Sequence, residues 1–497
     1  MNSFKNMPRA TSETMPSVWL FIGLFLALVI FFAVSLQSSI FGPNKVLTGP
    51  SGNEGKGPAP VVEEDDHLPA APVNRTKGPD DTKQVHEEKW TSSPKNFTAI
   101  PSGSVPPHPL KPICNLSDPR YDGCEMWGDA RTATAGNTSQ VFFIPPPAQL
   151  AAAEAATWRI RPQSRKVVAV REVVVRSLNL SDLGAAPSCT VRRSVPAVVF
   201  ALDGLTLNCW HAFSDVLVPL FTTARAFGGE VELVATHSDD LWFVGKYRRI
   251  FGALSRYRVV ALGAGGEVRC YRHLIVGLRG HRDLDIDPAR TPQRYDMLAF
   301  RLFVREAYAL PPPAAALPCK SGGGGGGKPR MMIILRAATR RFVNADAVLD
   351  AVEAAGFEVV RMEPTDAADM DAVAREVDAC DAVMGAHGAG LTNMVFLRTG
   401  GVVVQVIPWG VDPQHFGEGY FGSPAASMGV RHIAYSITAE ESTLYDKYGK
   451  DHPVITDPDM FYRNGMDDQL YWREQNIRLD TVRIVPTLEK VKQLLQE

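Results

Sequence analysis

From residue 330 onward the sequence alternates between short apolar runs and amphipathic segments, and this alternation leaves few folds open. The apolar runs typical of strands are 330–336, 357–363, 381–387 and 401–408, and the helical patterns between them are 344–356, 366–380 and 390–397. Strands separated by helices at this spacing form a parallel sheet with helices on both faces. The sequence therefore predicts an α/β fold with a doubly wound sheet in this half.

The preceding part of the chain has a similar but less regular pattern. Strand-like runs occur at 166–175, 196–202, 231–237, 257–262 and 273–278, and the longest helical pattern covers 208–227. We therefore predict two Rossmann-like lobes, 113–315 and 330–470, with an interlobe cleft. The end of the chain, 471–497, is predicted to be a C-terminal helix that packs across both lobes.

A Pro- and Gly-rich stretch separates the two halves, and we interpret 316–329 as a linker because its run of glycines favours flexible coil. Gly322, Gly327 and Lys328 match the start of a phosphate-binding loop. However, Pro329 stands where Ser or Thr would have to hold the metal.

An uncharged apolar stretch at 18–36 matches the ~20 residues that cross a bilayer as a helix. Lys5 and Arg9 precede it, with Glu13 as the only acid, which favours a cytosolic N-terminus. A cleaved signal peptide is the alternative, although its apolar region is normally shorter, about 7–15 residues. We expect a cytosolic tail at 1–17 and a transmembrane signal anchor at 18–36.

Residues 37–112 are rich in Pro, Gly, Ser and charge, so they cannot offset their ordering entropy and are predicted to form a disordered lumenal stem. Anchor, stem and globular part follow one another in Golgi membrane enzymes, and in some receptors. N-glycosylation sequons fit a lumenal placement and cluster at Asn74, Asn96, Asn115, Asn137 and Asn179.

Seven cysteines also fit an oxidising lumen, and the odd number leaves at least one unpaired. Cys114 and Cys124 are close enough to close a small loop, and Cys189 with Cys209 is the second pair that we expect. Cys380 ends a predicted helix and is expected to be an inert buried thiol. Zinc and redox sites have no support, because no Cys-x-x-Cys occurs.

Lys and Arg number 52 against 54 Asp and Glu, so the chain has no excess of positive charge with which to bind nucleic acid. No Gly-x-Ser-x-Gly elbow of a serine hydrolase is present.

The turn after the strand at 381–387 is unusual, because it places His387 among glycines. In a doubly wound sheet, ligands bind beyond the carboxyl ends of the strands. Gly388 and Gly390 let the backbone approach a ligand closely, and free N–H groups at the start of a helix favour an anion. His387 could add a hydrogen-bond donor, or a positive charge if its pKa is raised. The alternative is a tight turn around a buried histidine.

Two arginines point to the same place. Arg336 ends the strand at 330–336 and Arg340 follows it, with Asn344 expected to cap the next helix. Such a pair can clamp a diphosphate. The predicted donor-binding residues are Arg336, Arg340, His387, Gly388, Gly390 and Asn393. The turn does not match G-x-G-x-x-G, which disfavours a nicotinamide enzyme.

The first lobe offers candidates for a general base. His211 and Asp215 lie four residues apart in the helical pattern at 208–227 and so share a face. A histidine oriented by a carboxylate is a standard general base. Asp203, at the end of the strand at 196–202, is the rival base. The acids of DLDID, 283–287, are similar to a metal-binding D-x-D, but an exposed loop is the interpretation that we favour, and no metal ligand is assigned.

Five blocks, in this order, resemble glycosyltransferase family 61: CNLSDPRYDGCEMWGDAR, CWHAFSDVLVPLF, ILRAATRRFVN, MGAHGAGLTNMVFLRTGGVVVQVIPWG and YWREQNIRLD. The resemblance covers most of the chain after residue 113 and is closest to the plant branch that acts on xylan, particularly its grass clade. It implies a single-pass type II protein of the Golgi membrane, a GT-B fold and an inverting reaction. One block departs from the family's Gly-Asn-Phe-Phe-His and reads LTLNCWH, which keeps Asn208 and His211.

For that branch the resemblance implies UDP-arabinofuranose or UDP-xylose as donor and xylan or xylo-oligosaccharide as acceptor. Transfer of xylose to N-glycan cores, found in another branch, is the alternative within enzymes. A non-catalytic partner in a wall-polysaccharide synthesis complex is the alternative outside them. The sequence leaves open the pentose, the linkage, a divalent metal requirement and any homo- or hetero-oligomer with other wall-synthesis enzymes.

Overall fold

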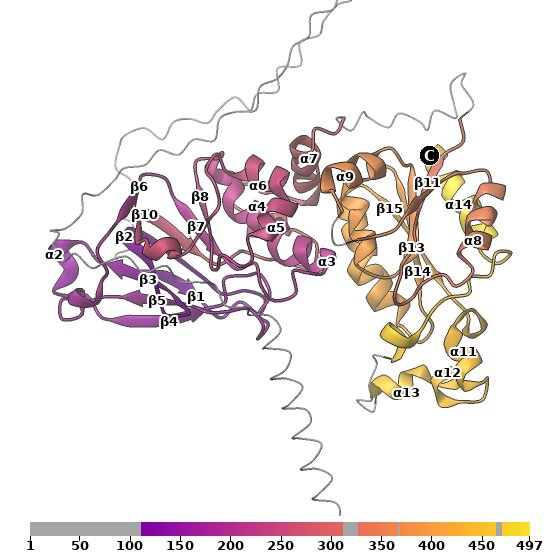
Figure 1. Ribbon diagram of the computed structural model, residues 1–497, viewed down its shortest axis with the longest axis horizontal. Coiled ribbons are helices and arrows are strands. Elements are labelled where there is room, and N and C mark those ends of the chain that lie inside the picture. Colours follow the sequence, from indigo (N-terminus) through magenta and orange to yellow (C-terminus); the bar gives the residue numbers. More distant parts are fainter. Residues whose placement is uncertain (1–110, 312–326, 366–367, 464–469) are drawn as a thin grey trace, which may run out of the picture. The chain divides into compact units, whose positions relative to one another are not determined.

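The computed structural model describes residues 111–311, 327–365, 368–463 and 470–497 (Figure 1). The predicted cytosolic tail, the signal anchor and nearly all of the stem lie outside these residues, as do Asn74, Asn96 and most of the linker. Within the described ranges, no helix combines the length and the apolar content that a membrane crossing requires.

The C-terminal sheet is fully parallel, and its strands follow the order β12-β11-β13-β14-β15. They are β11 (Arg330–Ile334), β12 (Glu358–Met362), β13 (Ala382–Ala386), β14 (Val402–Ile407) and β15 (Arg431–Ser436). Counted along the chain this order is 2-1-3-4-5, one of the two common doubly wound orders. The predicted parallel sheet is therefore confirmed, with β15 as an additional edge strand.

Helices cover both faces of this sheet. On β11, Met331 and Ile333 belong to one buried cluster while Met332 and Ile334 belong to another, as the two-residue period of a strand requires. The first cluster includes α8 (Ala345–Ala354) and α14 (Val485–Gln496), and the second includes α9 (Met370–Asp378). Figure 1 shows α8 and α14 on the opposite side of the sheet from α9.

The terminal helix α14 packs on β14 and β15. Its buried Leu488 and Val491 belong to the cluster formed by the C-terminal sheet alone. The prediction that it packs across both lobes is therefore wrong: its short apolar stripe is covered by one sheet face.

Shorter elements complete this part of the chain. They are the 3-10 segment η7 (Ala389–Phe396), the π-helical segments η8 (Gln414–Gly422) and η10 (Leu470–Glu474), and the helices α10 (Ser423–Ser427), α11 (Thr443–Tyr448), α12 (Pro453–Thr456) and α13 (Pro458–Arg463).

The N-terminal sheet is mixed. Its main path is β4-β5-β3-β2-β10-β7-β8-β9, with β1 on β2 and β6 on β10. The strands are β1 (Ile113–Asn115), β2 (Gly123–Ala135), β3 (Thr138–Ile144), β4 (Ala156–Ile160), β5 (Val173–Ser177), β6 (Val191–Arg193), β7 (Ala197–Phe200), β8 (Glu232–Ala235), β9 (Val260–Ala261) and β10 (Arg269–Val276).

Only part of this sheet fits the Rossmann-like prediction. Strands β10, β7, β8 and β9 run parallel, whereas β2 is antiparallel to both β10 and β3. Strand β2 was missed because its sequence, GCEMWGDARTATA, mixes glycine, charge and small residues and buries only some of its side chains. The helices of this part are α2 (Pro147–Leu150), α4 (Val218–Ala224), α5 (Trp242–Lys246), α6 (Arg248–Leu254) and α7 (Met297–Ala307).

The predicted helix at 208–227 exists but changes its winding. It begins as α3 (Cys209–His211), continues as the π-helical segment η2 (Ala212–Leu217) and returns to α-helix as α4. Pro219 has no N–H with which to bond the carbonyl of Asp215, one turn earlier. The backbone N–H of Ser164 donates to that carbonyl instead, at 3.3 Å. The proline therefore accounts for the break, and π turns of this kind are frequent at functional sites.

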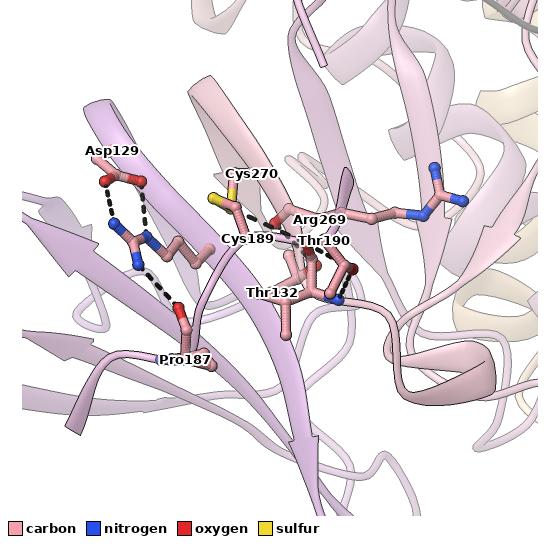
Figure 2. Close-up of a disulfide and its surroundings, with 9 residues drawn as sticks. Asp129, Thr132, Pro187, Cys189, Thr190, Arg269 and Cys270 are labelled. Atoms are coloured by element: carbon pink, nitrogen blue, oxygen red, sulfur yellow. Dashed lines mark hydrogen bonds and ion pairs between the residues drawn. A yellow bond between two sulfur atoms is a disulfide. The ribbon is translucent and has the colours of Figure 1, made fainter. Parts of the chain in front are cut away.

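Two disulfides lie in the N-terminal part. Cys114–Cys124 joins β1 to β2, as predicted, and Cys189–Cys270 joins the loop before β6 to β10. The predicted pair of Cys189 with Cys209 is therefore wrong: nearness in sequence suggested it, but β6 pairs with β10 and brings Cys270 to Cys189. Figure 2 shows this disulfide beside an ion pair of Asp129.

The remaining described cysteines are Cys209 and Cys380, and both are free. Burial raises the pKa of the Cys380 thiol to about 12, so this thiol stays protonated and unreactive, as expected.

Candidate functional site

The C-terminal site lies at the point where the strand order of its sheet reverses. Strands β11 and β13 are neighbours, and the chain leaves their carboxyl ends toward opposite faces. Ligands of doubly wound sheets bind at such a switch point. Arg336 lies two residues after β11, and His387 directly follows β13. The structure thus brings these two predicted residues to the same edge.

Gly388 is required where it stands. Its φ is 149°, which L residues rarely adopt. A Cβ atom at this position would collide with the guanidinium of Arg336. At Gly390 a Cβ would come within 3.0 Å of Ile334. The glycines of the turn therefore let η7 approach β11 and keep Arg336 against the turn.

Arg336 and Arg340 are partly buried, and neither forms an ion pair with a described carboxylate. Arg336 Nε donates to the carbonyl of Thr339 at 2.8 Å. Arg340 Nε is buried without a hydrogen-bond partner, and its guanidinium lies 5.3 Å from the ring centroid of Trp472. Burial lowers the pKa of both groups, and repulsion by Arg336 contributes to bringing that of Arg340 to about 10. Both stay charged at neutral pH, so the site holds two uncompensated positive charges.

His387 is buried between these arginines and an aromatic cluster. Burial, together with the charges of Arg340 and Arg336, lowers the pKa of His387 to about 3. The alternative of a positively charged histidine is thus wrong, and His387 is a neutral imidazole. Its Nδ1 lies 2.6 Å from Nε2 of Gln405 on β14.

Asn393 faces the turn rather than the arginines. It is 6% exposed, and its Nδ2 donates to the carbonyl of Gly390 at 3.0 Å. This bond stabilises the glycine turn, while contact with a ligand stays a prediction.

The C-terminal segment around η10 closes the other side of the site. Gln475 is fully buried; its backbone carbonyl accepts from Arg340 N at 2.8 Å and its side chain bonds both the N–H and the carbonyl of Trp409. The side chain of Asn344 donates to the backbone carbonyl of Leu479 and accepts from its backbone N–H. It makes no capping bond to α8, contrary to our expectation. Trp472, which sequence reasoning did not single out, belongs to one of the blocks that resemble the family.

In the N-terminal part, His211 and Asp215 form the predicted pair. Asn208 caps α3 by accepting from Trp210 N, and the π turn keeps Asp215 on the side of His211. His211 Nδ1 donates to Asp215 Oδ2 at 2.7 Å. The side chain of Asp215 is 1% exposed and that of His211 is 21% exposed.

Asp215 is held as a carboxylate. Its burial alone would raise the pKa, but hydrogen bonds from His211 and Arg165 more than offset this and lower it. A carboxylate accepts, so Nδ1 of His211 carries the proton. The lone pair on Nε2 is then free to take a proton from a bound hydroxyl.

Two arginines that sequence reasoning missed support this pair. Arg165 Nε donates to Asp215 Oδ2 at 2.9 Å, and Arg165 also pairs with Asp283. Arg120 bonds Asp283 at 2.6 Å and lies 3.6 Å from Asp215. The position of Arg120 in the block CNLSDPRYDGCEMWGDAR was the one available signal.

The three acids of DLDID are engaged by neighbouring groups, and Arg282 lies near both Asp285 and Asp287. Asp283 joins the arginine network, Asp285 lies 3.6 Å from Arg282, and Asp287 caps the 3-10 turn that follows.

Asp203, the rival base, lies apart in a hydrogen-bonded group. Its Oδ2 accepts from the backbone N–H and the Nε of Arg171, and the same guanidinium bonds Asp240 at 2.7 Å. Asp203, His237 and Asp240 are close enough to hold a cation, but Arg171 already pairs with both carboxylates. Arg171 and His237 line a polar hollow of about 350 Å³ at the carboxyl ends of β8 and β9. Among the described residues, Asp203 pairs with Arg171, and this cation stabilises the carboxylate rather than making it a stronger base.

Aromatic rings lie between the two groups of residues. Trp210 stacks on Tyr420 of η8, with ring centroids 5.0 Å apart, and Tyr420 lies 6.0 Å from the His387 ring. Trp210 also contacts His211 edge-on at 5.0 Å. One tyrosine therefore touches neighbours of both the candidate base and the candidate donor site.

Comparisons with known proteins identify the family of this chain. The family model Glycosyltransferase 61 matches residues 209–404, from α3 to β14. The chain is 39% identical to the beta-1,2-xylosyltransferase XYXT1 of Oryza sativa subsp. japonica over 404 residues, which cover 77% of this chain and 84% of that protein. The chain belongs to glycosyltransferase family 61.

Other relatives are similar over less of their length. The alpha-1,3-arabinosyltransferase XAT3 of the same rice is 39% identical over 76% of this chain, which spans 64% of that protein. The xylan glycosyltransferase MUCI21 of Arabidopsis thaliana is 27% identical over 74% of this chain and 77% of that protein. Among solved structures, a family 9 glycosyl transferase from Veillonella parvula covers 62% of this chain and 97% of its own, at 10% identity and a TM-score of 0.27.

Proposed function

We propose that this family 61 chain is a pentosyltransferase of xylan synthesis. It transfers arabinofuranose or xylose from a UDP-sugar to the xylan backbone. Its relatives include proteins named as an arabinosyltransferase, a xylosyltransferase and a xylan glycosyltransferase, and two of them are 39% identical to it. We further propose the GT-B arrangement, with donor and acceptor held between the two sheet-containing parts of the chain.

The observation that supports a nucleotide-sugar donor most strongly is a pair of partly buried arginines that have no counter-ion among the described residues. Burying a charge costs free energy unless an opposite charge compensates it. Within the described residues, Arg336 and Arg340 have no carboxylate partner, and Arg340 Nε has no hydrogen-bond acceptor at all. A diphosphate would supply acceptors and negative charge for both guanidinium groups.

His211 is the proposed base. The acceptor hydroxyl oxygen attacks the anomeric carbon of the pentose while the bond from that carbon to the UDP oxygen breaks on the opposite face. The hydroxyl proton passes to Nε2 of His211, and the electron pair of the broken bond leaves on UDP. Arg336, Arg340 and the His387 donor stabilise the charge that develops on the diphosphate. One displacement of this kind inverts the anomeric configuration.

The same proposal includes a place in the cell. The apolar stretch at 18–36 anchors the protein as a single-pass type II protein of the Golgi membrane, with the described residues in the lumen. The side chains of Asn115 and Asn137 are exposed, so glycans could be accommodated there.

The decisive experiment offers the purified full-length protein UDP-arabinofuranose, UDP-xylose and, as a control, UDP-glucose. Each donor is paired with xylo-oligosaccharides or with an N-glycan core peptide, with and without a chelator. We expect a pentose on the xylo-oligosaccharide and release of UDP. Transfer to the N-glycan core alone would favour the other enzyme branch. A protein that binds UDP yet transfers nothing from any donor would favour a non-catalytic partner.

A further inference from the structure

One polar side chain lies inside an otherwise apolar central strand. Strand β14 reads Val-Val-Val-Gln-Val-Ile and pairs with β13 and β15, and its Gln405 is fully buried. A buried amide without hydrogen bonds costs roughly 1–3 kcal/mol. The side-chain amide of Gln405 therefore needs hydrogen-bond partners inside the protein.

Gln405 has three such partners. Its Nε2 lies 2.9 Å from the carbonyl oxygen of Phe416 and 2.6 Å from Nδ1 of His387. Its Oε1 lies 2.8 Å from Nε2 of His432.

The carbonyl of Phe416 determines which groups of this network donate hydrogen bonds and which accept them. A carbonyl oxygen only accepts, so the amide group that faces it must be the NH2 of Gln405. The second hydrogen of that NH2 then points to Nδ1 of His387, which has to accept. The single proton of neutral His387 is consequently on Nε2. On the other side, His432 donates from its Nε2 to Oε1 of Gln405.

The competing arrangement has the Nδ1–H of His387 donating to the Phe416 carbonyl. It would place hydrogens on both nitrogens of the 2.6 Å contact with Gln405, which repel each other. The network therefore favours one tautomer.

We propose that Gln405 is a positioning residue that holds His387 as the Nε2–H tautomer, so that this ring presents a hydrogen-bond donor to the donor diphosphate. The inference rests on the proposed function. Phosphate oxygens only accept, so the opposite tautomer would turn a lone pair toward them. Neutral His387 thus depends on a residue of the next strand for the one tautomer that suits an anion.

The first test reads the tautomer directly and needs no ligand. In protein labelled with 15N-histidine, protonated and unprotonated ring nitrogens give separate signals, and the His387 signals are those absent from His387→Ala. We expect the Nε2–H pattern in the wild type. Gln405→Glu should reverse it, since a carboxylate accepts from Nδ1–H, and Gln405→Leu should lose the single pattern. His432→Phe removes only the Oε1 partner and should leave the His387 pattern unchanged.

The second test measures UDP affinity by calorimetry. Gln405→Leu should weaken binding about tenfold, the cost of one hydrogen bond to a charged group. In the His387→Ala background the same change should cost nothing further, because it acts only through His387. Circular dichroism and thermal melting establish that each variant is folded.

The outcomes separate the two proposals. The role of Gln405 would be overturned if Gln405→Leu kept the wild-type His387 signals. It would also be overturned if Gln405→Leu lowered UDP affinity equally in the wild type and in the His387→Ala background. If His387→Ala binds UDP as the wild type does, the donor site fails, and the role of Gln405 toward the diphosphate fails with it. In that case the tautomer spectra show whether the hydrogen-bond network itself was assigned correctly.

Discussion

The guanidinium of Arg340 lies over the indole ring of Trp472, 5.3 Å from its centroid. These residues come from opposite ends of the C-terminal part, and the same indole also lies 5.2 Å from the His387 ring. Trp472 thus shields a charged group that has no ionic partner in the part of the chain that the structure describes. We interpret it as one wall of the donor site.

Removal of this wall should weaken nucleotide binding. In Trp472→Ala, water reaches Arg340 and hydrates its guanidinium group. Because this hydration competes with binding of the diphosphate, we expect UDP affinity to fall about tenfold. This corresponds to about 1.4 kcal/mol, within the range of a desolvated cation–π contact. Trp472→Phe keeps an aromatic face and should lose less. Equal affinity of wild type and Trp472→Ala in calorimetry would exclude the indole from the site.

Substitution of an arginine without a carboxylate partner should have opposite effects on UDP binding and on the free energy of unfolding. Arg340→Met should lower UDP affinity about ten- to a hundredfold, because it removes a charged hydrogen bond. In the absence of ligand it should raise the free energy of unfolding by about 1 kcal/mol, because it removes a partly buried charge that has no carboxylate partner among the described residues. Arg361, whose ion pair with Asp346 is exposed, supplies the control: Arg361→Met should alter neither quantity much. If Arg340 had only a structural role, Arg340→Met would instead lower the free energy of unfolding.

The candidate bases give different kinetic results. His211→Ala should lower kcat by roughly 10²–10⁴ while UDP affinity stays intact. Asp215→Asn should cost less, since Nε2 of His211 remains. Asp203→Asn should stay close to wild type, because the Asp203 carboxylate is already paired with Arg171. The reverse ranking, an active His211→Ala and an inactive Asp203→Asn, would make the aspartate the base.

The two disulfides should differ in their effect on stability. Cys189–Cys270 spans 81 residues and Cys114–Cys124 spans 10. Loop-closure entropy predicts losses of about 4–5 and about 2–3 kcal/mol when each pair is replaced by serine. Thermal unfolding of the purified variants compares the two. Equal melting temperatures in the wild type and the Cys189→Ser, Cys270→Ser double variant would show that the longer bridge does not form.

Membrane orientation is tested in sealed Golgi vesicles. The globular part should resist added protease until detergent opens the membrane, and glycosidase treatment should increase its mobility on a gel. Substitution of Asn115 by Gln should remove one glycan, because this side chain is exposed. Digestion of the globular part in intact vesicles would refute a lumenal location.

The C-terminal sheet could be predicted from sequence because its inner strands β11, β13 and β14 are buried on both faces and read as continuous apolar runs. From that pattern alone, Arg336 and His387 could be placed at one edge. The lone glutamine in Val-Val-Val-Gln-Val-Ile was visible as well, but its meaning depends on the carbonyl of Phe416, which only the fold brings near.

The N-terminal part was less predictable for physical reasons. Its antiparallel strands β2 and β3 have partly exposed faces, so polar side chains interrupt the apolar pattern. The spacing of His211 and Asp215 was sufficient to pair them, although the winding between them is π rather than α. Arg120 and Arg165 meet Asp283 across long sequence separations, which no local pattern encodes.

The residues that close the proposed donor site from the C-terminal side are translated after all the described strands. Trp472, Gln475 and Leu479 follow every strand of both sheets in the chain, yet they contact Arg340, Trp409 and Asn344. A growing chain can pair β11 to β15 before this segment has left the ribosome, but it has no complete pocket for a nucleotide sugar. A nucleotide sugar therefore cannot guide the pairing of β11 to β15 during synthesis, because the proposed donor site is complete only after Trp472 and Gln475 have been added.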